Sequence, residues 1–129
     1  MSEADDLGRQ WLRRAQNDLN SAEAHHVDTS LSPATTCWLA QQAAEKAIKA
    51  LLVRAQVDFP FTHDLAALSL LLGESLPVPS EDLVHLTKVA SDSRYPGEAP
   101  EPVRDDADTL LAIARTVVAE AARRFDGKG

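Results

Sequence analysis

The chain's fold is decided by the stretch QQAAEKAIKALL, which runs from Gln41 to Leu52. Ala, Ile and Leu cover most of its circumference, and this is the pattern of a helix at the centre of a bundle. Gln41 lies inside the apolar stripe. We expect only three positions of the stretch to face solvent: Gln42, Lys46 and Lys49. The stretch therefore predicts a central helix over about residues 33–56, with one polar group in its packed face.

Further helices are predicted on both sides of this stretch. Apolar residues at helical spacing indicate a first helix over about residues 6–26. Pro, Gly and Ser residues then separate a short helix after Asp64, a fourth after Ser80 and a fifth from about Pro102. The expected fold class is all-α: an antiparallel bundle of about five helices, with an up-and-down core of three long ones. We expect one domain over residues 1–129, with an ordered core over about 7–125.

The composition argues against several classes of protein. The formal net charge of −7 disfavours stable DNA binding and a general nucleic-acid coat, which need a basic face. No apolar run reaches the roughly 18 residues of a membrane span, and the acidic start is unlike a signal peptide. Cys37 is the single cysteine, which excludes a four-thiolate zinc site and suits a reducing cytoplasm. No cofactor, metal site or membrane contact is expected.

Gln41 and Glu45 are one helical turn apart and face largely inward. A buried amide is costly unless it is hydrogen-bonded, so a partner must satisfy Gln41. One interpretation is that Gln41 helps line a pocket or a subunit interface. The other is that it ties a neighbouring backbone into the bundle.

The triplet Thr62-His63-Asp64 precedes the predicted third helix. Thr62 or Asp64 suits the role of helix N-cap. His63 is then either part of a helix entry or a base, ligand or anion contact.

The segment Arg94-Tyr95-Pro96-Gly97 has the most functional character. Arg94 offers a planar fork for phosphate or carboxylate, and Tyr95 adds a stacking surface with a hydroxyl. The structural alternative is a helix end, at which Arg94 offsets the helix dipole and Tyr95 fills the core.

Four segments in this order resemble the HEPN domain, the higher-eukaryote-and-prokaryote nucleotide-binding fold. They are WLRRAQNDL (Trp11 to Leu19), CWLAQQAAEKAIKALL (Cys37 to Leu52), THDL (Thr62 to Leu65) and SRYP (Ser93 to Pro96). The likeness extends over about residues 7–125. It implies a compact helical bundle that usually dimerises, in a cytoplasmic prokaryotic protein.

The resemblance also implies function. HEPN proteins are frequently paired with a small nucleotidyltransferase encoded nearby, often as a toxin–antitoxin couple. We therefore expect a homodimeric module that binds a nucleotide such as ATP, a partner transferase, or both. Carried over by motif, the expected ligand-binding residues are Gln41, Glu45, His63, Arg94 and Tyr95.

One departure from the family pattern bears on catalysis. Nuclease members carry an arginine followed four to six residues later by a histidine, and no arginine–histidine pair here has that spacing. The chain is therefore expected to be a non-nucleolytic member, with no catalytic residue. The alternative is a metal-independent ribonuclease toxin with a degenerate site, in which folding brings Arg94 near His63.

Overall fold

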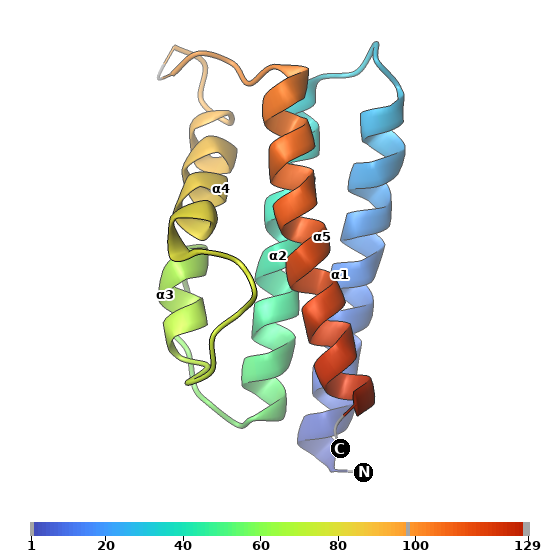
Figure 1. Ribbon diagram of the computed structural model, residues 1–129, viewed down its shortest axis with the longest axis vertical. Helices are drawn as coiled ribbons and strands as arrows, with labels where there is room; N and C mark the ends of the chain where they lie inside the picture. The colour runs from blue at the N-terminus through green and yellow to red at the C-terminus, as the bar shows by residue number, and fades with distance from the viewer. Residues whose placement is uncertain (1, 98, 128–129) are drawn as a thin grey trace.

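The computed structural model describes residues 2–97 and 99–127, and in these ranges the chain forms five helices and no strand. Three are long: α1 (Glu3–Val27), α2 (Pro33–Arg54) and α5 (Arg104–Gly127). Two are shorter: α3 (Leu65–Leu70) and α4 (Ser80–Asp92). Figure 1 shows α1, α2 and α5 side by side as an up-and-down core, with α3 and α4 together on one flank. The predicted fold class is confirmed.

Side-chain caps set several helix starts. Ser2 Oγ accepts from the amide of Asp5 at the start of α1, and Ser32 Oγ accepts from Ala34 at the start of α2. Asp64 Oδ1 accepts from the amide of Ala67, so Asp64 is the N-cap of α3. Pro33 occupies the first turn of α2, where its missing N–H costs nothing. These local signals fix the position of α3 directly after His63.

The helix α2 is the centre of the bundle and contacts each of the other four helices. Small side chains allow close approach, because five of its alanines have no exposed surface: Ala40, Ala43, Ala44, Ala47 and Ala50. Gly8 of α1 contributes to the same closeness. A Cβ there would lie 2.9 Å from Phe125 Cζ and 3.0 Å from the carbonyl oxygen of Ala50. At position 8, therefore, α1, α2 and α5 approach one another so closely that only glycine fits.

Cys37 and Lys49 are both buried in the core, for different reasons. Cys37 is fully buried, and burial raises the pKa of its thiol to about 11, so it packs as a small apolar side chain. The expectation that Lys49 faces solvent is wrong, because its side chain is only 8% exposed. Its charge is compensated inside the protein by groups described below.

Across the described residues, no helix is long and apolar enough to cross a membrane.

Candidate functional site

A buried polar cluster lies on one face of α2, and we call it the α2 cluster: Gln41, Glu45, Lys49 and His63. Gln41, Glu45 and Lys49 follow one another at four-residue spacing, so they are aligned on that face. Only 2% of Gln41, 5% of Glu45 and 6% of Lys49 is exposed. His63 comes from the segment before α3 and has a half-exposed side chain. The cluster therefore joins the middle of the bundle to its surface.

Glu45 is the centre of the α2 cluster. Its Oε2 accepts a hydrogen bond from Lys49 Nζ at 2.8 Å, and its Oε1 lies 2.9 Å from His63 Nδ1. Gln41 Nε2 is 3.4 Å from the same Oε1 and donates to the backbone carbonyl of His63 at 2.8 Å. The buried carboxylate is thus matched by a cation and further donors, as burial of a charge requires. The interpretation that Gln41 ties a neighbouring backbone is confirmed for its amide nitrogen.

The contact with Glu45 orients the ring of His63. A carboxylate can only accept, so Nδ1 carries the proton and donates it to Glu45. In the neutral ring, Nε2 is then an acceptor, and no described residue forms a hydrogen bond with it. Phe61 packs edge-on against the same ring, with centroids 5.6 Å apart. The result is an imidazole with a fixed tautomer and one unused nitrogen on a half-exposed side chain.

Lys49 completes the α2 cluster on its inner side. Its Nζ lies 5.9 Å from the ring centroid of Trp11 on α1 and 5.6 Å from that of Phe59. Both distances are within the range of a cation–π interaction. Lys49 is therefore held by one carboxylate and two aromatic rings, which explains how a lysine is stable at this depth.

A second site lies nearer the N-terminal end of α2, and we call it the Trp38 shelf: Ala34, Thr35, Trp38, Ser93 and Arg94. These residues line an open groove of about 430 Å³. The guanidinium of Arg94 lies over the ring of Trp38, 4.4 Å from its centroid, and 5.9 Å from the centroid of Tyr95. Tyr95 is 56% exposed, so it does not fill the core as the structural alternative proposed. The shelf thus presents a cation that packs on the ring of Trp38, with Tyr95 as a second aromatic side chain nearby.

The structure brings some predicted site residues together and separates others. Gln41, Glu45 and His63 are in direct contact, whereas Arg94 belongs to the Trp38 shelf and Tyr95 lies near it. Trp38 precedes Glu45 by seven residues on α2, which at about 1.5 Å per residue places the two sites roughly 10 Å apart along the helix. Trp38 and Glu45 also lie on the same side of α2, because seven residues complete about two turns.

Among the members that sequence reasoning missed are Trp38, which packs against Arg94, and Lys49, which pairs with Glu45. Lys49 follows Glu45 by four residues, the spacing at which a glutamate and a lysine pair on a helix, and this signal was available. Trp38 gave no such signal, because its partner Arg94 is distant in the sequence. Every aromatic residue except Phe125 contacts the α2 cluster or the shelf, in the order Trp11, Trp38, Phe59, Phe61 and Tyr95.

Two side-chain amide atoms in this part of α2 make no hydrogen bond with a described residue. Gln41 Oε1 and Gln42 Nε2 are buried and have no hydrogen-bond partner among the described residues. A buried polar atom without a partner is uncommon in folded proteins and often marks a functional position. Chemically, this part of α2 offers a cation, stacking surfaces, a histidine nitrogen and two amides. Within the described ranges, no group of His, Cys, Asp and Glu side chains is arranged to hold a metal ion.

Comparison with known proteins agrees with this fold. The sequence profile of the HEPN domain matches residues 9–124. The crystal structure of TT1696 from Thermus thermophilus is similar with a TM-score of 0.77 and 28% identity, covering 91% of this chain and 97% of that one. ST0689, an archaeal HEPN homologue, is similar with a TM-score of 0.68 and 25% identity, covering 97% of this chain and 99% of that one. A comparison with curated proteins gave no match.

Proposed function

This chain belongs to the HEPN domain family, and we propose that it is a non-catalytic member. We propose that it binds a nucleotide such as ATP, and that the nucleotide binds at the Trp38 shelf. We propose further that it acts as a homodimer with a small nucleotidyltransferase, as one half of a toxin–antitoxin couple. The family is a nucleotide-binding and ribonuclease-associated one, and the two sites on α2 supply the chemistry that such a ligand needs.

The observation that carries the proposal is the position of Arg94 over the ring of Trp38, with Tyr95 nearby. A guanidinium donates paired hydrogen bonds to phosphate oxygens, and an aromatic face stacks on any nucleobase. The shelf provides both within one open groove of about 430 Å³. A nucleotide has a base and phosphates a short distance apart, so it matches this combination better than a purely apolar or purely anionic ligand does.

The α2 cluster extends this site. It begins at Gln41, three residues or roughly 5 Å farther along the helix than Trp38, and His63 carries its unused Nε2 on a half-exposed side chain. Gln41 Oε1 and Gln42 Nε2 lie between Trp38 and Glu45 in the sequence and have no described partner. We propose that a ligand seated on the shelf extends along α2 towards His63. The family resemblance marks Gln41, Glu45, His63, Arg94 and Tyr95 as ligand-binding residues, and we propose that they then contact the same ligand.

The partner proposal rests on the family resemblance and on the exposed aromatic residues. Phe61 is 92% exposed on the segment that Gln41 and Glu45 hold in place. Aromatic residues are enriched at protein interfaces, because they bury much area at little entropic cost. Phe61 is an exposed aromatic side chain next to His63, and it is a suitable contact for a partner transferase.

Calorimetric titration with ATP tests the nucleotide site. We expect saturable binding to the wild-type protein and a loss of about tenfold or more in affinity for Arg94→Ala, since it is the central cation of the site. Tyr95→Ala is expected to weaken binding less, because Trp38 still offers a stacking face. Arg13→Ala, on the exposed side of α1, is the matched control and should bind normally. The proposal fails if neither nucleotides nor the transferase encoded nearby bind the wild-type protein.

One observation favours the second candidate, a metal-independent ribonuclease toxin. His63 is oriented by a buried carboxylate and keeps Nε2 unused, which is how a general base is prepared. Incubation of RNA with the purified protein in excess EDTA tests this function, with His63→Ala and Arg94→Ala as variants. Cleavage abolished by both substitutions would support the ribonuclease. An intact RNA substrate and unimpaired cell growth on expression would exclude it.

A further inference from the structure

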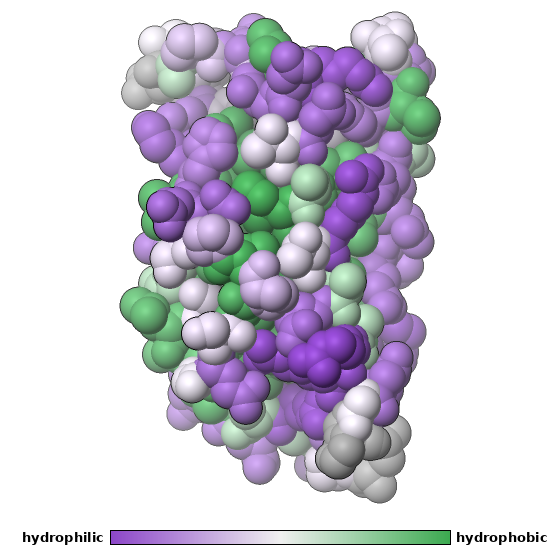
Figure 2. Space-filling model, viewed as in Figure 1, coloured by the Kyte–Doolittle hydropathy of each residue, from purple (hydrophilic) through white to green (hydrophobic). Residues whose placement is uncertain are grey.

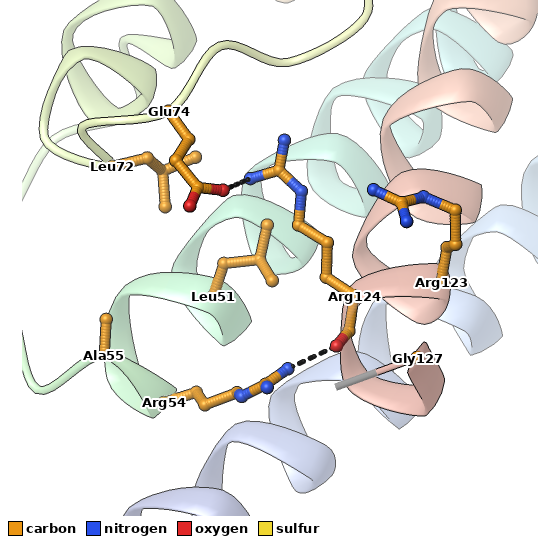
Figure 3. Close-up of a pocket in the computed structure, with 8 residues that line it drawn as sticks. All are labelled: Leu51, Arg54, Ala55, Leu72, Glu74, Arg123, Arg124 and Gly127. Atoms are coloured by element: carbon orange, nitrogen blue, oxygen red, sulfur yellow. Dashed lines mark hydrogen bonds and ion pairs between the residues drawn. The ribbon is translucent and has the colours of Figure 1, made fainter. Parts of the chain in front are cut away.

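A second pocket, which the proposed function does not use, opens at the other end of α2. It has a volume of about 510 Å³. We call it the arginine pocket, and its lining consists of Leu51, Arg54, Ala55, Leu72, Glu74, Arg123, Arg124 and Gly127. Figure 3 shows Arg54 and Arg124 on opposite walls, with Leu51 between them. Figure 2 shows a strongly hydrophilic patch on the surface over the C-terminal end of α5.

The guanidinium of Arg124 is fixed by three neighbours. Its Nε donates to Glu120 at 2.7 Å and its Nη2 donates to the carbonyl of Ser75 at 2.8 Å. Its Nη1 faces only the carboxylate of Glu74 among the described residues, at 3.4 Å. Arg124 is therefore oriented in advance, with one nitrogen directed at an anion.

Arg54 forms the opposite wall in a comparable way. Its Nη1 donates to the carbonyl of Arg124 at 2.7 Å, and its guanidinium lies 4.8 Å from the ring centroid of Phe125. Its Nε is 3.8 Å from Asp5, which is too long for a hydrogen bond. Arg54 thus keeps donor capacity while its position is fixed by the end of α5.

The described residues that line this pocket carry more positive than negative charge, with three arginines and one glutamate. Arg123 and Arg124 share one carboxylate, that of Glu120. Their hydrogen bonds lower the pKa of Glu120 to about 2, which keeps it ionised. Glu74 is the single acidic residue that lines the pocket. Its side chain is 76% exposed and makes one ion pair, so little free energy holds it there.

We propose that the arginine pocket binds a phosphate group and that the Glu74 carboxylate occupies the position of that anion when the pocket is empty. Arg54 and Arg124 present donors from two walls, and a tetrahedral dianion can accept from both, whereas Glu74 contacts only Arg124. Leu51 and Leu72 exclude water from one side, which strengthens these interactions. The pocket is separate from the Trp38 shelf, because Trp38 and Arg54 are sixteen residues, or roughly 24 Å, apart on α2.

The test measures the arginine Nε–Hε signals by NMR while inorganic phosphate, pyrophosphate or ATP is added. It uses the Arg94→Ala protein, so that binding at the shelf does not contribute and the two proposals fail independently. We expect saturable shifts of the Arg54 and Arg124 signals, with the Arg13 signal unchanged. Shifts with inorganic phosphate would identify the free anion as sufficient, and shifts with ATP alone would identify a nucleotide as the source of the phosphate.

Two substitutions in this background decide the result. Glu74→Gln removes the competing carboxylate and should tighten binding about two- to fivefold, which misfolding cannot imitate. Arg54→Gln should weaken binding at least fivefold. Absence of saturable shifts in both the parent and the Glu74→Gln protein would overturn the proposal. Equal affinities of these two proteins would overturn the role of Glu74.

Discussion

The α2 cluster and the arginine pocket are built from similar groups but differ in burial. In the cluster, Glu45 and Lys49 are each less than a tenth exposed, and every charge is matched. In the pocket, Arg123 and Glu74 have side chains that are 68% and 76% exposed. Water stabilises an unpaired charge in the arginine pocket but not in the α2 cluster. The ion pair of Glu45 and Lys49 is therefore indispensable in the α2 cluster. The ion pair of Glu74 and Arg124 in the arginine pocket is exchangeable.

The largest effect is expected from Glu45→Ala. This change leaves Lys49 buried without a counter-ion, so the free energy of unfolding should fall by about 3–5 kcal/mol. Urea denaturation measures the loss. Glu120→Ala is the matched control at the arginine pocket. Arg123 is 68% exposed and can turn to water, and Arg124 keeps its contacts with Glu74 and Ser75, so this change should cost about 1 kcal/mol. Equal losses in the two variants would contradict the comparison.

Replacing the buried pair by apolar residues sharpens the comparison. Glu45→Leu combined with Lys49→Met should bring stability back to within about 1 kcal/mol of the wild type, because no unpaired charge is left inside. His63 then loses its carboxylate partner, so its ¹⁵N signals should report a mixture of tautomers instead of one. A double variant as unstable as Glu45→Ala would show that packing, and not charge, determines the stability of this face.

The smallest expected effect is on the stability of the folded protein at low pH. The pKa of Glu120 is about 2 in the folded protein, below its ordinary value of 4.5. The ionised carboxylate therefore contributes stability above about pH 4.5, and this contribution is lost as the pH falls towards 2. Since the pair is at the surface, it amounts to at most about 1 kcal/mol. Unfolding measured from pH 7 to pH 2 should show a shallower decline for Glu120→Gln than for the wild type, and identical profiles would contradict the assignment.

The elements of the fold were predictable from local signals. Apolar periodicity indicated α1, α2 and α5, and Ser32, Pro33 and Asp64 marked the starts of α2 and α3. These signals act within a few residues, so they can be read without knowledge of the rest of the chain. The errors were small shifts of helix ends, such as α5 beginning at Arg104 instead of about Pro102.

The sites were predictable only in part. Gln41, Glu45 and His63 were each predicted as ligand-binding residues, but the sequence did not show that they meet, and the structure places them in contact. Lys49 was assigned to solvent because the periodicity of α2 cannot show that Trp11 and Phe59 cover it. The arginine pocket gave no signal at all. Arg54, Glu74 and Arg124 come from three separate segments, and each looks like an ordinary surface residue in the sequence.

The sequence by itself determined the helices, their caps, the alanine-rich centre and the family to which the chain belongs. The tertiary structure decided which charged residues are buried, which partner each one has, and where cavities are left. The physical reason is the separation in sequence of the residues that interact. Helix formation depends on neighbours within about one turn, whereas burial and charge pairing depend on residues that only the packing of α1, α2 and α5 brings together.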